Sequence, residues 1–528
     1  MSVAVHSLLI VTESYEVGGL ETYIAGQVRA MVAQGWAVHL ACGSEPAAEF
    51  LPPGLFTLRS GLALGPDATV TDLVATVEGL RALIREKAVT HVHAHPFTSL
   101  FPAMLAAAME GVPFVLTLHG PTSLSSGYGP VNDYLLAALV LPSANAVLAV
   151  SDEVGDLVAP YVGEGALRIQ HNAVDVNRFG QPGSPVPQDA PWLAVSRLDA
   201  VKIHGIRAFV NEAHALGLGR VDIVGDGPGR ATLEEWLEQD GVAHTVRFLG
   251  MRSDVESLMR SSAGVAGMGR VLLEGVACGK PVCMVGYDGV KGFVDPDLFR
   301  RGAYANFSGR NLPNAPAEDL FSQRAKATSQ LADLRSTLLQ YHSEDAVWSS
   351  FAKQISAFTY SAQPLVRAIY SVIRSPEAAS PAAYLTSEDL FYRLGRVVHS
   401  AAYFSPQAAA CYRFYEARTS ALAIAGTQQQ QKQEQQEQKA HQDRLAGAQQ
   451  ELSAMFAQAE ERSSAAIERV LEQVQSCDAE RKRQDEELAE AVKALESAVV
   501  GLDTRLREQK TLGQRVSGAA KNLLGRHT

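Results

Sequence analysis

The feature that most limits the possible folds of this chain is a regular alternation of short apolar runs and longer helix-like segments. In the first half of the pattern the runs are Ser7–Thr12, Ala37–Cys42, His91–His95, Phe114–His119 and Ala146–Val150. In the second half they are Trp192–Val195, Val221–Val224, Val246–Leu249, Val265–Gly267 and Val282–Val285. Short apolar runs separated by helices are typical of buried strands in a parallel sheet. The sequence therefore predicts two tandem doubly wound α/β domains that face a cleft.

Length and composition agree with a multidomain globular protein. The chain has 528 residues, of which 47% are hydrophobic. It can bury more than one core, and we expect roughly three units. A formal net charge of −11 argues against general nucleic-acid binding, because such proteins carry a basic excess. The five cysteines show no paired spacing suited to zinc or to a disulfide framework, which favours a reducing compartment.

The sequence shows no pattern of a targeting or membrane-spanning segment. The N-terminus lacks a basic region before its apolar run and lacks a cleavage-like site, so it predicts a first strand and not a signal peptide. The longest apolar stretch, Leu135–Val150, is interrupted by Pro142 and Asn145 and is too short to span a bilayer. We expect no transmembrane segment and a cytoplasmic location, which includes a peripheral position at the inner face of the membrane.

The segment Ala266–Val282 combines a flexible glycine pair with the start of a helix. Gly267 and Gly269 lack a Cβ atom, so the backbone can approach a ligand closely there, and Val271–Ala277 is predicted to be helical. The unpaired N–H groups of a helix start carry partial positive charge and bind anions such as a pyrophosphate without a metal. Glu274, in the first turns of this helix, could accept hydrogen bonds from ribose hydroxyls.

This segment resembles the donor-site motif of the family 4 retaining glycosyltransferases. In that motif an acidic residue, a glycine, an aromatic residue and a second glycine precede four mostly apolar residues and a glutamate. Glu274 matches the final glutamate, whereas the initial acidic residue corresponds to Ala266, which leaves open how the donor sugar ring is held. Arg270 is a candidate to compensate, and its alternative role is that of a solvated arginine at a helix start. The resemblance implies that Arg270 and Val271 belong to the donor-binding set.

The resemblance also implies the GT-B architecture, in which the donor binds mainly to the second Rossmann-like domain and the acceptor to the first. The first domain would span residues 1–180 and the second residues 181–344, with the crossover near Asn172–Phe179. A helix over Asp345–Phe358, within a returning segment of residues 345–360, would pack back on the first domain. Its apolar residues at helical spacing are Trp348, Phe351 and Ile355.

Two parts of the first domain match the family. Gly18 and Gly19 follow the first predicted strand, so their N–H groups could face a diphosphate, although an isolated glycine pair is also typical of a plain turn. His119 ends a predicted strand, where open α/β sheets bind ligands, and it matches the histidine that faces the donor sugar. The alternating histidines of His91–His95 share one face, but no carboxylate pattern accompanies them, and we expect no metal site there.

In the second domain Arg197 and Lys202 reproduce the family's spacing between two cations that clamp the donor diphosphate. Breaking the bond to a nucleotide diphosphate leaves negative charge on the leaving group, which cationic side chains and helix-start amides stabilise. A solvated charged loop is the alternative. Gly225 and Gly227 match the next family loop, which borders the base. The absence of a G-x-G-x-x-G pattern there weakens an interpretation as an NAD-dependent dehydrogenase.

The chain after residue 360 carries no cluster of residues with site-like spacing. Residues 361–426 predict a helical linker, and residues 427–528 contain a glutamine-rich segment followed by apolar residues in three- and four-residue steps. Such steps are typical of a coiled coil, so we expect self-association or binding of a partner helix, with a single solvated helix as the alternative. Asn306–Arg310 could border the cleft, but the sequence gives it no chemical role.

These features predict a GT-B glycosyltransferase that moves a sugar from a nucleotide-diphosphate donor to an acceptor hydroxyl with retention of configuration. No metal or cofactor is expected besides the donor, and the residues expected to act on it are His119, Arg197, Lys202 and Glu274. By analogy the acceptor is a glycan, lipid-linked or protein acceptor in bacterial surface glycan or polysaccharide synthesis. Two alternatives stay open: a catalytically weakened transferase-like scaffold organised by the coiled coil, which Ala266 favours, and a sugar-nucleotide epimerase of the same architecture.

Overall fold

The computed structural model describes residues 6–16, 18–46, 51–124, 128, 130–163, 165–180, 186–187, 189–401 and 490. The chain up to Val397 clusters as one compact unit, and a second unit begins at Val398. Apart from residue 490, the predicted coiled coil and glutamine-rich segment lie outside the described residues, as do residues 402–426 of the predicted linker. Self-association through this part of the chain stays a prediction from the sequence.

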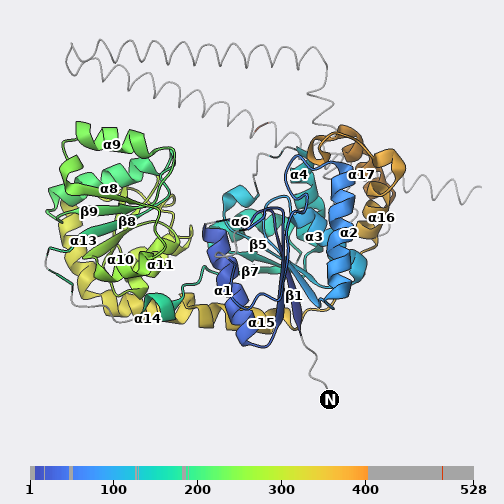
Figure 1. Ribbon diagram of the computed structural model, residues 1–528, viewed down its shortest axis with the longest axis horizontal. Coiled ribbons are helices and arrows are strands. Elements are labelled where there is room, and N and C mark those ends of the chain that lie inside the picture. Colours follow the sequence, from blue (N-terminus) through green and yellow to red (C-terminus); the bar gives the residue numbers. More distant parts are fainter. Residues whose placement is uncertain are drawn as a thin grey trace, which may run out of the picture. The chain divides into compact units, whose positions relative to one another are not determined.

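A parallel sheet forms the centre of the first domain (Figure 1). Its strand order is β3-β2-β1-β4-β5-β6-β7, and every neighbouring pair is parallel. The strands are β1 (Ser7–Thr12), β2 (Ala37–Cys42), β3 (Thr57–Arg59), β4 (His91–Ala94), β5 (Phe114–Leu118), β6 (Ala146–Ala149) and β7 (Leu167–Ile169). Every residue of β1, β4, β5 and β6 is buried, as expected for strands with helices on both faces.

The second domain is built on a sheet with the order β10-β9-β8-β11-β12-β13. Its strands are β8 (Trp192–Val195), β9 (Val221–Val224), β10 (Val246–Gly250), β11 (Gly264–Gly267), β12 (Val282–Val285) and β13 (Val290–Phe293). The pair β12 and β13 is antiparallel, whereas the other neighbours are parallel. The prediction of two tandem doubly wound α/β domains is confirmed.

Helices separate the strands of both sheets and follow the last strand. Those up to the crossover are α1 (Gly19–Ala33), α2 (Val70–Glu86), α3 (Leu100–Glu110), α4 (Pro130–Leu135), α5 (Leu141–Ser143), α6 (Asp152–Val158) and α7 (Val176–Phe179). Those that follow are α8 (Ile203–Ala215), α9 (Arg230–Gln239), α10 (Val255–Ser261), α11 (Arg270–Ala277), α12 (Pro296–Ala303), α13 (Ala317–Ser329), α14 (Leu331–His342), α15 (Glu344–Ile355), α16 (Pro364–Ile373) and α17 (Glu388–Ala401). None of the helices in the described part of the chain is long and apolar enough to cross a membrane.

Side-chain caps set several of these helix starts. Thr69 Oγ1 accepts a hydrogen bond from Asp72 N at 3.2 Å before α2, and Asp72 Oδ2 accepts one from Thr69 N at 2.9 Å. Asp295 Oδ1 accepts one from Leu298 N at 2.8 Å before α12. Ser343 Oγ accepts one from Ala346 N at 3.3 Å before α15. Each cap satisfies an N–H group that has no partner within its helix.

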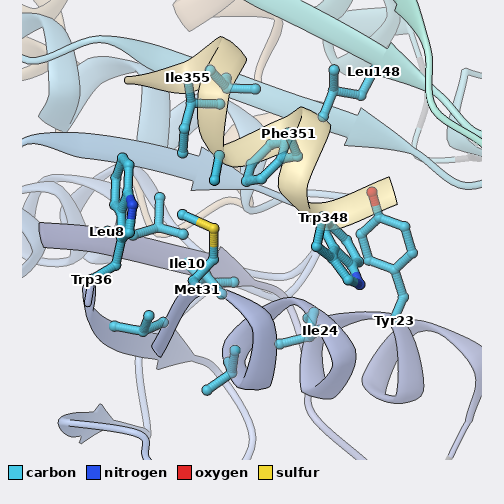
Figure 2. Packing of buried hydrophobic residues seen from close by; sticks show 14 of the residues in the cluster. Leu8, Ile10, Tyr23, Ile24, Met31, Trp36, Leu148, Trp348, Phe351 and Ile355 are labelled. Carbon is cyan, nitrogen blue, oxygen red and sulfur yellow. The ribbon is translucent and has the colours of Figure 1, made fainter. Parts of the chain in front are cut away.

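Helix α15 packs on the core of the first domain although it follows the second domain in sequence (Figure 1). Figure 2 shows Trp348, Phe351 and Ile355 of this helix among apolar side chains of β1 and α1. Each of the three is 1% exposed. The Trp348 ring meets the Tyr23 ring edge-on at a centroid distance of 4.8 Å. Because these side chains recur every three or four residues, one face of α15 completes the first hydrophobic core.

Replacing Trp348 by alanine should reduce the free energy of unfolding by about 3–5 kcal/mol, because the substitution leaves a cavity in a closed core. Chemical denaturation measures this loss. The control is Lys353→Ala on the same helix, where the side chain is exposed and little change is expected. Equal stability of the two variants would contradict the packing of α15 described above.

Candidate active site

The strand orders determine where ligand-binding loops gather. In the first sheet β1 lies between β2 and β4, and in the second sheet β8 lies between β9 and β11. The chain therefore reverses its direction of winding at β1 and at β8. Open parallel sheets bind ligands outside the carboxyl ends of their strands beside such a reversal. The loops that follow β1, β4, β5, β8, β9 and β11 define the candidate site.

The glycine pair after β1 lies at an open helix start. Gly19 is the first residue of α1, and the Gly18 carbonyl oxygen accepts hydrogen bonds from Thr22 N at 3.2 Å and from Thr22 Oγ1 at 2.8 Å. A Cβ atom built on Gly19 would meet no atom within 4 Å. The first N–H groups of α1 have no partner within the helix. Contact of Gly18 and Gly19 with a diphosphate stays a prediction that this open geometry allows.

His119 directly follows β5 and contacts two side chains that sequence reasoning did not connect with it. Its Nε2 lies 2.9 Å from Nδ1 of His95, which directly follows β4. The ring of Tyr23 meets the His119 ring edge-on at a centroid distance of 4.8 Å. Tyr23 is itself held, because Gln170 Nε2 donates a hydrogen bond to its hydroxyl at 2.9 Å. The imidazole of His119 is therefore oriented before any ligand binds.

The histidines of β4 take part in hydrogen bonds of the interior. His93 is fully buried, its Nδ1 lies 2.7 Å from Gln27 Nε2, and its Nε2 lies 2.8 Å from Thr117 Oγ1. Burial lowers the pKa of His93 to about 3, and burial together with the charge of Arg270 lowers the pKa of His119 to about 3. Both imidazoles are therefore neutral near pH 7. No group of three or more His, Cys, Asp or Glu side chains within the described ranges is arranged to hold a metal ion.

Arg197 and Lys202 lie in the loop between β8 and α8, where one carboxylate contacts both. Asp199 Oδ2 lies 3.3 Å from Arg197 Nε and 3.4 Å from Lys202 Nζ. Asp199 Oδ1 also accepts a hydrogen bond from Lys202 N at 3.0 Å. The Arg197 side chain is 73% exposed and the Lys202 side chain 24% exposed, so both cations remain accessible to an anion. The sequence shows Asp199 between the two cations, but only the structure shows that it organises them.

Gly225 and Gly227 pack against the backbone of the loop that carries Arg197 and Lys202. Their φ angles are +127° and +155°, which L side chains rarely adopt. A Cβ atom on Gly227 would lie 2.5 Å from the Leu198 carbonyl oxygen, and one on Gly225 would overlap the Ser196 carbonyl oxygen. Only glycine therefore lets the two loops approach so closely. Contact of these glycines with a nucleotide base stays a prediction.

Only two residues, Met268 and Gly269, connect β11 to α11. Gly269 has φ +61° and ψ −132°, and its N–H donates a hydrogen bond to the Phe307 carbonyl oxygen at 2.9 Å. A Cβ atom on Gly267 would lie 2.7 Å from Val271 Cγ1, so this glycine permits close packing of strand and helix. Because Gly269 N–H is occupied, the N–H groups of Arg270 and Val271 are the first unpaired donors that α11 offers to an anion.

The structure shows the surroundings of Ala266, the residue that corresponds to the family's initial acidic residue. Ala266 belongs to β11, is fully buried, and packs in a hydrophobic cluster with Trp192 and Ile223. A glutamate at this position would place its carboxylate in the core of the second domain and not in the cleft.

Arg270 is not a solvated arginine. Its side chain is 14% exposed, and its Nη1 donates a hydrogen bond to the Ala173 carbonyl oxygen at 2.7 Å. Its Nε lies 3.8 Å from Glu274 Oε1. Burial lowers the pKa of the Arg270 guanidinium and raises the pKa of the Glu274 carboxyl, while the charge of each partner opposes these shifts. The two side chains therefore compensate one another's charge beside the helix start.

A cavity of about 300 Å³ adjoins this charged group. Arg29 Nη2 donates a hydrogen bond to Glu344 Oε1 at 2.6 Å at its wall. Gly18, at the start of α1, and Arg270, at the start of α11, both line this cavity. Its lining also includes Thr22, Asp175, Arg178 and Phe179. Sequence reasoning missed Arg29 and Glu344, which are separated by 315 positions and carry no local signal.

Two doubly wound domains, each with loops at a winding reversal, provide two ligand-binding edges. The family model for Glycosyltransferase Family 4 matches residues 17–178, and the model for Glycosyl transferases group 1 matches residues 191–306. The chain thus contains a glycosyltransferase catalytic region of the family 4 type. The residues of the predicted site lie within these two matched regions.

Individual proteins are similar to this chain in sequence or in fold. The glycosyltransferase EpsF of Bacillus subtilis is 26% identical over 269 residues, which are 46% of this chain and 69% of EpsF. The fold is similar to Anabaena Alr3699/HepE, solved in complex with UDP, with a TM-score of 0.50, 19% identity and coverage of 67% of this chain and 100% of HepE. A glycosyltransferase from Rickettsia africae gives a TM-score of 0.52 at 15% identity, with coverage of 67% and 98%. These two structures support the GT-B fold.

The buried histidines predict a loss of stability on acidification. The pKa of His93 is about 3 in the folded state, whereas an ordinary histidine in the unfolded state has a pKa near 6.5. Between these two values only the unfolded state takes up the proton, so acidification favours unfolding. The free energy of unfolding should therefore fall as the pH falls from about 6.5 toward 3, by at most about 1.4 kcal/mol per pH unit for His93.

Urea denaturation at pH 7.5 and at pH 5.5 measures this dependence. His93→Gln should reduce the difference between the two pH values by about 1 kcal/mol, because one buried imidazole no longer titrates. The exposed residue His214 provides the control as His214→Gln. An unchanged pH dependence in His93→Gln would contradict a buried neutral imidazole at this position.

Proposed function

We propose that the protein transfers a sugar from a nucleotide-diphosphate donor to an acceptor hydroxyl with retention of configuration and without a metal. The observation that carries this proposal is the joint contact of Arg197 and Lys202 with Asp199 at one edge of the second sheet, beside the open start of α11. The family 4 match of the catalytic region supports it. UDP-sugars are the first donors to test, because the structure of HepE was determined with UDP.

The chemistry of the leaving group explains why these residues suit the reaction. When the bond from the sugar to the diphosphate breaks, negative charge develops on the departing phosphate. Arg197, Lys202 and the N–H groups of Arg270 and Val271 can stabilise that charge by charge-assisted hydrogen bonds and by the helix dipole. In the proposed mechanism the departing phosphate itself accepts the proton of the acceptor hydroxyl, so that proton transfer requires no protein base.

His119 and Glu274 are proposed to act at opposite parts of the donor. His119 is neutral and its Nε2 is occupied by His95, so its Nδ1 is the nitrogen proposed to contact a sugar hydroxyl. Glu274 is proposed to accept hydrogen bonds from the ribose. Because Ala266 lies in the core, the sugar ring must be held by other groups, and Arg270 is the charged side chain at the start of the donor helix that we propose for this role.

The acceptor is proposed to bind in the first domain, where the cavity beside Gly18 offers both carboxylates and guanidinium groups. Such a lining suits a hydroxyl-rich glycan, because hydroxyl groups donate to carboxylates and accept from arginines. A role in bacterial surface glycan or polysaccharide synthesis rests on the family resemblance. A weakened, scaffold-like transferase is the second candidate, because the family's initial acidic residue has no counterpart in the cleft.

A thermal-shift panel of UDP-, GDP- and ADP-sugars tests the donor and the metal requirement together. A ligand that binds only the folded state raises the apparent melting temperature. We expect sugar nucleotides of one class to raise the melting temperature. We also expect the protein to release or transfer the sugar of that donor equally well when EDTA is present. An absolute and reversible requirement for Mn²⁺ or Mg²⁺ would contradict the metal-free site. No stabilisation by any nucleotide would favour the scaffold function.

Lys202→Ala should lower kcat by roughly 10²- to 10³-fold, because one electrostatic donor to the leaving group is lost. Glu274→Ala should instead weaken nucleotide binding, which isothermal titration measures. The matched control is Lys353→Ala, an exposed lysine on α15. A Lys202→Ala variant with the rate of the control would show that this lysine does not face the leaving group.

A further inference from the structure

We name Met268–Gly269, the connection from β11 to α11, the donor loop. The segment that follows α12 contacts both the donor loop and the first domain. We name Tyr304–Arg310 the brace loop. Its residues Asn306 and Phe307 have φ angles of +53° and +56°, a left-handed conformation that is uncommon outside glycine and an outlier for a bulky side chain. Such conformations persist where the surrounding structure over-determines them, and they concentrate at functional sites.

The middle of the brace loop fixes the donor loop. The Phe307 carbonyl oxygen accepts the hydrogen bond from Gly269 N at 2.9 Å. The Phe307 side chain is 2% exposed and packs against Phe299 at a ring-centroid distance of 4.7 Å. Asn306 Oδ1 accepts a hydrogen bond from Asn172 Nδ2 in the crossover segment at 2.9 Å. The carbonyl group that orients Gly269 is therefore held by a buried aromatic side chain and by a side-chain hydrogen bond.

The two ends of the brace loop contact helix α6 of the first domain. Arg310 Nε lies 2.7 and 2.9 Å from the carboxylate oxygens of Glu153, and Arg310 Nη2 also contacts that carboxylate. Glu153 N donates a hydrogen bond to the Tyr304 carbonyl oxygen at 3.0 Å. The Tyr304 hydroxyl donates one to Asp156 Oδ2 at 2.9 Å. A bidentate guanidinium–carboxylate pair has a defined geometry, so this contact specifies one arrangement of α6 and the brace loop.

We propose that the brace loop is a positioning element of the donor site, with Phe307 and Arg310 as positioning residues. The Arg310–Glu153 pair holds the brace loop against the first domain, and the Phe307 carbonyl transmits that position to Gly269 and hence to the free N–H groups of α11. The donor loop has only two residues, so contacts from another segment are needed to fix its position. The expected effect of the brace loop on nucleotide binding rests on the proposed function. The support of Gly269 by the brace loop does not depend on that function.

The structural part is tested by hydrogen–deuterium exchange of the peptide that contains Gly269, whose amide the Phe307 carbonyl protects. Arg310→Ala and Glu153→Gln should each raise exchange there by about three- to tenfold, a range typical of mutations that modulate coupling. The matched control is Arg300→Ala on α12, because the Arg300 side chain is 78% exposed and pairs only locally with Asp297. Exchange in Arg310→Ala equal to that in Arg300→Ala would overturn the proposal.

A charge exchange separates the ion pair from a general loss of stability. The double variant Glu153→Arg with Arg310→Glu should return the exchange of the Gly269 peptide toward the wild-type rate, whereas each single reversal should raise it. Failure of the double variant to improve on both single reversals would contradict a direct coupling through this pair. Global stability measured by denaturation should differ little between Arg310→Ala and Arg300→Ala, so a merely destabilised fold does not mimic the result.

Titration with UDP connects the brace loop to the donor. Arg310→Ala should raise the Kd for UDP by about three- to tenfold relative to wild type and to Arg300→Ala. Unchanged UDP affinity in a variant with raised exchange at Gly269 would contradict the positioning role. If wild-type protein binds neither UDP nor another nucleotide of the panel, the proposed function fails, while the exchange experiment still decides whether the brace loop holds Gly269.

Discussion

Parallel pairing of neighbouring strands is the constraint on which the candidate site depends. Because β1 pairs in parallel with β4, and β8 with β11, the segments that follow these strands leave each sheet at the same edge. The segments that carry Gly18 and His95 leave the first sheet at one edge in this way, and those that carry Arg197 and Gly269 leave the second sheet at one edge. No single motif creates the site, since each contributes one loop that the sheet brings beside the others.

The antiparallel pairing of β12 with β13 also affects the candidate site. Strand β12 ends at the same edge as β11, and β13 then carries the chain back toward the opposite edge. Helix α12 follows β13 and returns the chain to the donor loop, where the brace loop meets Gly269. The antiparallel strand therefore lets a segment more than 30 positions after Gly269 support the start of α11.

Hydrophobic runs predicted the central strands well and the peripheral strands poorly. The predicted bounds of Ser7–Thr12, Ala37–Cys42, Trp192–Val195, Val221–Val224 and Val282–Val285 agree with the strands residue for residue. Strands β3 and β7 were missed because each has three residues at a sheet edge with partial exposure, so neither forms an apolar run. Strand β13 was missed because Lys291 interrupts it. That lysine is buried only because Asp288, Leu312 and Asn314 supply oxygen atoms to its ammonium group.

The same division holds for the candidate site. Motif spacing made Arg197, Lys202 and Glu274 candidates, because cation and helix-start patterns are local in sequence. It did not reveal that the Asp199 carboxylate contacts both cations, or that His95 is the partner of His119, because those contacts arise from the folded chain. Spacing also gave no sign that Ala266 is buried. The distance of a residue from Glu274 in the sequence does not show on which side of a strand its side chain lies. The Ala266 side chain lies on the side that faces the core.

Helix α15 shows why the core and the site cannot be separated in this protein. Its Trp348 packs on Tyr23, and Tyr23 packs on His119, so the position of the histidine depends on the closure of the first core. Its first residue, Glu344, pairs with Arg29 at the wall of the cavity. Burial raises the pKa of Glu344, whereas the charges of Arg29 and Arg270 oppose that shift. The helix that completes the first core thus also supplies negative charge beside Arg270, which lets the start of α11 keep a buried guanidinium next to the N–H groups proposed to bind the diphosphate.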